Sequence, residues 1–204
     1  MGKIIFLGDS ITDSHHNLGV DDKGLGDGYV RLTAQYLEKL GGTYTVLNRG
    51  HDGFTAQGVL RLLGRDCIVH QPEIVSILVG CNDVGVEMNT GKTLKEQNFS
   101  GTYEKILCEI EEYTNAKIIC MAPFIFPYPQ EYANWIAGIR KIETVTRELA
   151  ERHKAIFLPL HDRLQEEAKR FGYRAVTTDG IHLTERGAET VAKAAKQGIL
   201  KALE

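Results

Sequence analysis

The chain has 204 residues, of which 43% are hydrophobic and 25% are charged, as is usual for a globular protein. Its formal net charge of -3 argues against nucleic acid or an anionic membrane surface as a partner. No apolar stretch approaches the ~20 residues that cross a bilayer, and no signal peptide precedes the first predicted strand, so we expect a cytoplasmic protein with no membrane partner.

Short apolar runs alternate with amphipathic helical periods along the chain. In chain order, these patterns predict a strand at 3–7, a helix at 29–40, a strand at 44–48, a helix at 55–63, a strand at 73–79, a helix at 102–114, a strand at 117–121, a helix at 134–153, a strand at 155–159, and helices at 162–171 and 184–203. The polar segments 12–28 and 84–100 are expected to lie outside these elements. The alternation favours a parallel sheet between two helical layers, an α/β/α sandwich formed by one domain over residues 1–204.

The spacing of cysteine and histidine residues gives no sign of a metal site. His15 and His16 are adjacent on one loop and His51 lies on the next, with no carboxylate or thiol at ligand spacing. The four cysteines show neither CxxC nor paired-loop spacing, and they are Cys67, Cys81, Cys108 and Cys120. We therefore expect reduced thiols, no metal and no cofactor.

Polar and glycine residues follow the predicted strands at the ends where an open α/β sheet binds its ligands. Ser10 follows the first strand, Gly53 the second and Asn82 the third, while Asp179 and His182 lie in the loop before the last helix. Singly, each has a plainer explanation as a cap, a turn residue or a structural histidine. Together they supply the nucleophile, base, carboxylate and oxyanion donors that acyl transfer requires.

The spacing Asp179-x-x-His182 allows a carboxylate to lie beside an imidazole within one turn of the chain. Asp179 would then hold one ring nitrogen and leave the other to face Ser10. The side-chain amide of Asn82 and the backbone N–H groups of Ser10 and Gly53 are candidate oxyanion donors.

Four blocks of the sequence resemble those of the SGNH hydrolases, the GDSL-type esterases and lipases. They are Gly8-Asp9-Ser10, Asn48-x-Gly50-x-x-Gly53-x-Thr55, Gly80-Cys81-Asn82-Asp83 and Asp179-Gly180-Ile181-His182. The blocks follow the family's order over nearly the full length, with Cys81 where threonine is more usual. The resemblance implies a flavodoxin-like sandwich with sheet order 2-1-3-4-5, a triad of Ser10, Asp179 and His182, and an oxyanion hole of Ser10, Gly53 and Asn82.

Three further stretches resemble the intracellular branch of this family that removes acetyl groups from xylan or its oligosaccharides. They lie at residues 6–13, 26–30 and 122–124. The resemblance implies a serine esterase acting on a small-molecule or oligosaccharide acyl ester. A lysophospholipase or thioesterase of the same family is the first alternative, and a non-catalytic carbohydrate- or nucleotide-binding α/β domain is an alternative from another class. The sequence leaves open whether copies of the chain form a homo-oligomer.

Other residues near these loops have less certain roles. We expect Asp9 to brace its loop, while His51 is compatible with substrate contact or with a solvated loop position. Phe124 begins an aromatic stretch, 124–135, that suits either a substrate pocket or a subunit contact. The stretch 86–93 imitates a phosphate-binding loop but lacks its first glycine and a strand directly before it, so we expect a surface or substrate-side loop there.

Overall fold

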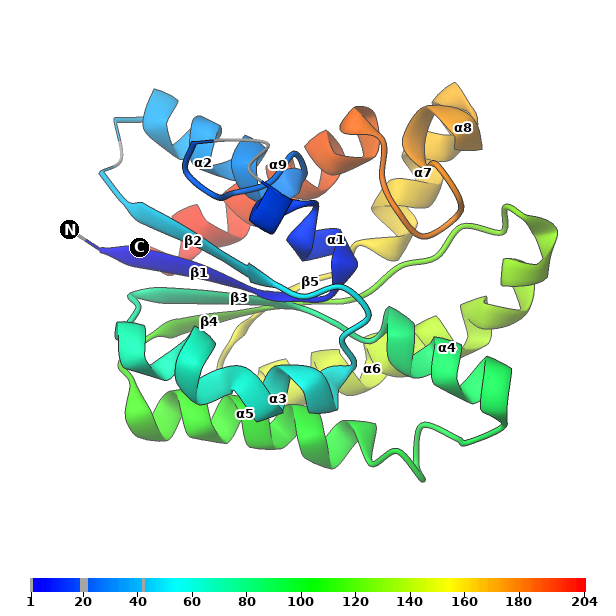
Figure 1. Cartoon of the computed structure of the whole chain (residues 1–204), viewed down its shortest axis with the longest axis horizontal. Helices are drawn as coiled ribbons and strands as arrows, with labels where there is room; N and C mark the ends of the chain where they lie inside the picture. The colour runs from blue at the N-terminus through cyan, green and yellow to red at the C-terminus, as the bar shows by residue number, and fades with distance from the viewer. Residues whose placement is uncertain (1, 19–21, 42) are drawn as a thin grey trace.

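The computed structural model describes residues 2–18, 22–41 and 43–204. A five-stranded parallel sheet with the order β2-β1-β3-β4-β5 lies at its centre (Figure 1). The strands are β1 Lys3–Gly8, β2 Thr45–Gly50, β3 Ile74–Leu78, β4 Lys117–Met121 and β5 Ile156–Leu158. The fold class and sheet order expected from the sequence are confirmed. The order reverses between β1 and β3, so the carboxyl ends of these two strands are where a sheet of this type binds its ligands.

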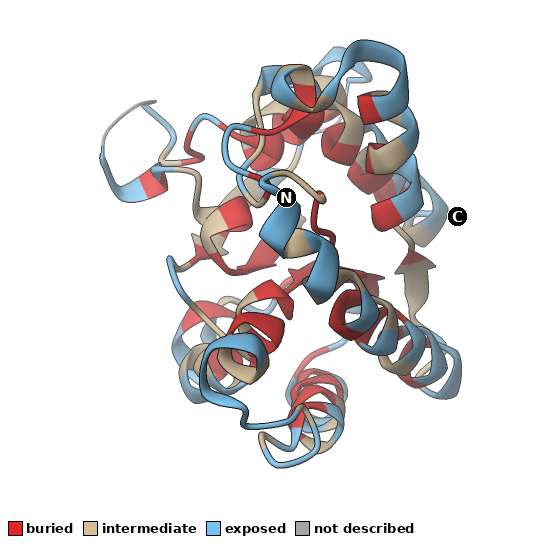
Figure 2. Ribbon diagram, turned by 90° about the vertical axis from the view of Figure 1, so that its right-hand side faces the viewer, coloured by how far each residue is buried: buried red, intermediate tan, exposed pale blue. Residues whose placement is uncertain are grey.

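Helices cover both faces of the sheet, with α2, α7, α8 and α9 on one side and α3, α4, α5 and α6 on the other (Figure 1). Their bounds are α1 Ser10–Asp13, α2 Tyr29–Lys39, α3 Ala56–Asp66, α4 Cys81–Thr90, α5 Phe99–Tyr113, α6 Ile136–Arg152, α7 His161–Phe171, α8 Tyr173–Val176 and α9 Glu185–Ala202. Among the described residues, short 3-10 turns occupy η1 His16–Leu18, η2 Ile68–His70 and η3 Gln130–Trp135. Figure 2 shows buried residues on the helix faces that meet the sheet and exposed residues outside.

Both faces of strand β1 are buried, which explains why apolar and polar residues do not alternate in its sequence. Ile4 and Phe6 belong to the core on the α2 and α9 side, whereas Ile5 and Leu7 belong to the core on the α3 side. All four side chains are at most 2% exposed. Each such side chain stabilises the fold by about 1.5–3 kcal/mol relative to exposure, which fixes the register of β1 and hence the position of the residues after it.

The segment 84–100 differs from the expectation that it lies outside helices and strands. Helix α4 covers its first part, and α5 begins at Phe99. The sequence pattern does not predict α4, because Asn82, Asp83 and Gly85 are weak helix formers. The helix forms because Cys81 and Val84 are buried in the core, a tertiary contribution that outweighs local propensity. The prediction of a surface or substrate-side loop at 86–93 is therefore wrong for residues 86–90, which belong to α4.

Some sequence expectations touch positions outside the described residues. The loop expected at 12–28 includes residues 19–21, which lie outside the described residues, while Thr12 and Asp13 belong to α1 and His16–Leu18 form η1, so the expectation of a loop is wrong for those positions. Within the part of the chain that the structure describes, no helix is both long and apolar enough to cross a membrane.

Candidate active site

Ser10 is the first residue of α1, immediately beyond the end of β1. Asp9 caps this helix, because its side-chain Oδ1 accepts the backbone N–H of Ile11 at 3.0 Å. Glycine is required at position 8, since a Cβ there would overlap the side chain of Thr12 and the carbonyl oxygen of Leu78. The turn from β1 into α1 therefore places the Ser10 hydroxyl at the carboxyl edge of the sheet.

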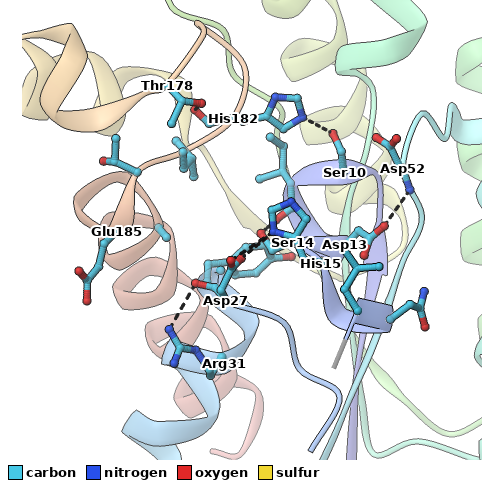
Figure 3. Close-up of a pocket in the computed structure, with 18 residues that line it drawn as sticks. Ser10, Asp13, Ser14, His15, Asp27, Arg31, Asp52, Thr178, His182 and Glu185 are labelled. Carbon is cyan, nitrogen blue, oxygen red and sulfur yellow. Dashed lines mark hydrogen bonds and ion pairs between the residues drawn. The ribbon is translucent and has the colours of Figure 1, made fainter. Parts of the chain in front are cut away.

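The structure brings Ser10, His182 and Asp179 together. The Nε2 atom of His182 lies 2.9 Å from the Oγ atom of Ser10 (Figure 3), and its Nδ1 atom lies 2.6 Å from Oδ2 of Asp179. With Asp179 ionised, Nδ1 carries the ring proton and donates a hydrogen bond to the carboxylate, while Nε2 accepts a hydrogen bond from the serine hydroxyl. This is the arrangement in which an imidazole can take a proton from a serine nucleophile.

Asp179 and His182 are held by one compact turn. Oδ1 of Asp179 accepts the backbone N–H groups of Ile181 at 2.9 Å and His182 at 2.7 Å. Partial burial acts to raise the pKa of Asp179, but the hydrogen bonds from His182 and the two backbone groups outweigh it and lower that pKa below its usual range. Asp179 is therefore ionised at neutral pH, as an orienting carboxylate must be.

The loop that follows β4 supports this turn from outside. The backbone N–H of Phe126 donates to the carbonyl oxygen of Gly180 at 2.9 Å. Gly180 has a φ of +98°, and a Cβ there would overlap the carbonyl oxygen of Tyr128 and lie 2.7 Å from Cδ2 of Tyr132. This support was missed in the sequence, where only the pairing of an aromatic stretch with a conformationally demanding glycine could have suggested it.

The candidate oxyanion donors come from the starts of α1 and α4 and from the loop after β2. Gly53 adopts a φ of +71° with open space where a Cβ would stand. The side chain of Asn82 donates through Nδ2 to the carbonyl oxygen of Phe54 at 2.9 Å, and its amide retains a second hydrogen. The loop carrying Gly53 and the helix carrying Asn82 are thus joined directly.

Two buried carboxyl groups lie beneath these loops. Asp9 is 2% exposed and Asp83 is 3% exposed. The pKa of Asp9 is raised to about 7, chiefly by burial and also by the neighbouring charge of Asp83, although the hydrogen bond from Ile11 opposes the shift. Burial also raises the pKa of Asp83 to about 6, although its carboxylate accepts the backbone N–H of Ala56 at 3.1 Å. Both acids act on the loops through backbone hydrogen bonds.

Two of the residues considered for substrate contact are engaged with other side chains. His51 is half-buried, and its Nε2 atom lies 2.7 Å from Oδ2 of Asp66 on α3. Phe124 is 3% exposed and packs against Phe126 in the core, with ring centroids 5.9 Å apart. Neither belongs to the described lining of the cavity beside Ser10, and burial of the apolar ring explains the position of Phe124.

Comparison with known proteins places these features in a family. The model of the GDSL-like lipase/acylhydrolase family matches residues 6–190. An acetylxylan esterase of Geobacillus stearothermophilus is 27% identical over 202 residues, covering 94% of this chain and 91% of that protein.

Solved structures share the same fold. The crystal structure of the acetylxylan esterase Axe2 from Geobacillus stearothermophilus is 24% identical and covers 97% of this chain and 94% of its own, with a TM-score of 0.83. An alpha/beta hydrolase from the metagenome of Lake Arreo, Spain, is 21% identical and covers 98% of this chain and 94% of its own, also with a TM-score of 0.83. The match of the family model over most of the chain shows that this protein belongs to the GDSL-like lipase/acylhydrolase family and is a carboxylic ester hydrolase.

Proposed function

We propose that this esterase removes small acyl groups, in particular acetyl groups, from a carbohydrate, with Ser10 as nucleophile, His182 as general base and acid, and Asp179 as the residue that orients His182. The observation that carries the proposal is the hydrogen-bonded sequence Ser10–His182–Asp179. The resemblance to an acetylxylan esterase supports the choice of acetyl esters of sugars.

In the acylation step, the Oγ atom of Ser10 attacks the ester carbonyl carbon and its proton moves to Nε2 of His182. The carboxylate of Asp179 stabilises the imidazolium through Nδ1–H. Negative charge develops on the carbonyl oxygen, and the backbone N–H groups of Ser10 and Gly53 and the amide of Asn82 are the proposed donors to it. The C–O bond to the alcohol then breaks as His182 returns its proton to the leaving oxygen.

In the deacylation step, water replaces the alcohol. His182 takes a proton from water as the water oxygen attacks the acyl carbon, and the bond between that carbon and Oγ of Ser10 then breaks. The proton returns from His182 to Ser10, and the carboxylic acid leaves. Both half-reactions use the same base and the same oxyanion donors.

Kinetics of Ser10→Ala test the assignment of the nucleophile. We expect kcat to fall by ~10⁴-fold or more while the thermal unfolding temperature stays close to that of the wild type. A serine-directed fluorophosphonate should label the wild type and not the variant. A folded variant with wild-type kcat would refute the proposal, and a wild type that neither labels nor hydrolyses esters would favour a non-catalytic binding domain.

A substrate panel tests the proposed acyl group and alcohol. Acetylated xylo-oligosaccharide, a lysophospholipid and an acyl thioester should be compared by kcat/KM at equal pH and salt. The highest value is expected for the acetylated oligosaccharide, with a steep loss for 4-nitrophenyl esters longer than propionyl. A preference for the lysophospholipid or for long acyl chains would instead support the lipid esterases of the family.

A further inference from the structure

A cavity of about 830 Å³ begins at Ser10 and His182 and extends between α1, the start of α2 and the start of α9 (Figure 3). Its volume lies within the range of sites that enclose a small-molecule ligand, roughly 300–1,000 Å³. An acetyl group contributes three heavy atoms, so it fills a minor part of this space. The cavity must therefore receive another part of the ester.

The position of the cavity relative to the reacting atoms indicates which part. Its described lining includes Ser10 and His182 but neither Gly53 nor Asn82, two of the three proposed oxyanion donors. The carbonyl oxygen belongs beside those donors, and the alcohol oxygen belongs beside Nε2 of His182, which returns the proton to it. The cavity thus lies on the side of the alcohol, an assignment that rests on the proposed function.

Carboxylates dominate the charged part of the described lining. They belong to Asp13, Asp27, Asp52 and Glu185, and Arg31 is the one lysine or arginine among the described lining residues. The Asp27 carboxylate lies 3.2 Å from Nδ1 of His15, and Figure 3 shows these two side chains facing each other. Carboxylates accept hydrogen bonds from hydroxyl groups, so this lining suits an alcohol with several O–H donors.

Arg31 supplies the complementary donors at the far end of the same cavity. Its Nη2 atom donates to the carbonyl oxygen of Asp27 at 3.5 Å, while its Nε atom is buried without a hydrogen-bond partner among the described residues. The N–H groups on the two Nη atoms of the guanidinium are the ones that can donate to a ligand oxygen. Hydroxyl and ether oxygens of a sugar can accept from such a group, whereas an aliphatic acyl chain cannot.

We propose that this cavity selects the alcohol portion of the substrate as an uncharged polyhydroxy compound and rejects anionic ones. The excess of carboxylates repels a uronate, phosphate or nucleotide group, and the polar side chains lower the affinity for a long acyl chain. Asp27 and Glu185 are the specificity-determining residues in this assignment, since they lie on different elements and both contribute negative charge to the lining.

Two esters that differ in one charge test the proposal. The mono-O-acetylated methyl glucoside carries a neutral hydroxymethyl group where the matching methyl glucuronide carries a carboxylate. At low salt we expect kcat/KM for the glucuronide ester to be lower by about tenfold or more, because several like charges line the cavity. At 1 M NaCl the ratio should approach one, since the Debye length there is about 3 Å.

Charge-removing variants assign the effect to residues. Asp27→Asn and Glu185→Gln should each reduce the preference for the glucoside ester, measured as its kcat/KM divided by that of the glucuronide ester, severalfold at low salt. Circular dichroism is the check on folding. Glu148→Gln on α6 is the matched control, since Glu148 is exposed on the helical layer that covers the opposite face of the sheet. The control should leave the ratio unchanged.

The outcomes separate this inference from the proposed function. Equal kcat/KM values for the two sugar esters at low salt, with Ser10-dependent hydrolysis of 4-nitrophenyl acetate intact, would overturn the inference and leave the esterase assignment standing. A ratio that does not respond to Asp27→Asn and Glu185→Gln in folded proteins would also overturn it. If the wild type showed no ester hydrolysis that depends on Ser10, the proposed function would instead be rejected.

Discussion

Asp83 accepts the backbone N–H of Ala56 at 3.1 Å, and this bond joins the start of α4 to the start of α3. The neighbouring residue Asn82 donates to the carbonyl oxygen of Phe54 at 2.9 Å. Two consecutive residues of one helix therefore hold the loop that carries Gly53. Gly53 and Asn82, the proposed oxyanion donors that follow two different strands, are thus fixed relative to each other by α4.

Removing the amide of Asn82 should weaken transition-state binding. We expect Asn82→Ala to lower kcat by about 10²–10³-fold, the usual effect of losing one oxyanion donor. Asn89→Ala is the control, because Asn89 is exposed on the same helix. Steady-state kinetics with 4-nitrophenyl acetate measures both. A decrease of less than threefold for Asn82→Ala would remove Asn82 from the oxyanion hole.

Asp83 should act as a positioning residue for the same donors. Asp83→Ala removes the acceptor for the N–H of Ala56, and the resulting displacement of the Gly53 loop should lower kcat by about 10–10²-fold with a smaller change in KM. Asp83→Asn keeps an acceptor oxygen and should retain most of the activity. If the two variants have equal kcat, the hydrogen bond to Ala56 does not position the loop.

The buried carboxyl group of Asp9 should make stability fall as pH rises. Its pKa is raised from 3.8 to about 7 by burial, so between these values the folded protein keeps a proton that the unfolded chain has lost. The free energy of unfolding should therefore decrease across that interval, on the order of a few kcal/mol for this group, and level off above about pH 7.

Urea unfolding at pH 4 to 8 measures this dependence in the wild type and in Asp9→Asn. The variant keeps an acceptor for the N–H of Ile11 but cannot ionise, so its stability should decrease less between pH 4 and pH 7. Asp83 contributes in the same direction in both proteins, because burial raises its pKa to about 6. Parallel curves for the two proteins would contradict the raised pKa of Asp9.

Gly180→Ala should disturb the turn that carries Asp179 and His182. A Cβ at position 180 combines a φ of +98° with overlap against the carbonyl oxygen of Tyr128. Gly91→Ala is the matched control, since Gly91 has a φ of +76° and open space around it. We expect the control to lose about 1 kcal/mol of stability and Gly180→Ala to lose about 3 kcal/mol.

Kinetics distinguish the two glycine variants further. Gly180→Ala should lower kcat, because a shift of the turn moves Nε2 of His182 away from Oγ of Ser10, whereas Gly91→Ala should keep it. Equal losses of stability and unchanged kcat in both variants would show that the loop after β4 does not fix the position of His182.

The parts of the site that the sequence could predict are those with strong local signals. The apolar run of β1 places Ser10 at a sheet edge, and three residues suffice to bring Asp179 beside His182. The strands were located to within a residue or two, because buried parallel strands have near-continuous apolar sequences.

The remaining parts depend on tertiary contacts that leave no local pattern. Helix α4 contains poor helix formers, and burial of Cys81 and Val84 stabilises it. Phe124 was a candidate for substrate contact, yet its ring is buried with Phe126. The support of Gly180 by the loop after β4 joins segments that are far apart in the chain, so spacing alone could not predict it.

Ser10 and His182 are separated by 172 positions in the chain, although Oγ of Ser10 and Nε2 of His182 lie 2.9 Å apart. With these residues in their proposed roles, ester cleavage requires that the first strand and the loop before α9 are both docked in their native positions. A partly folded intermediate with a formed sheet but an undocked loop would have native-like circular dichroism and no hydrolytic activity. The rate at which activity returns during refolding thus measures the docking of the loop before α9. Spectroscopy of the secondary structure would not detect this step.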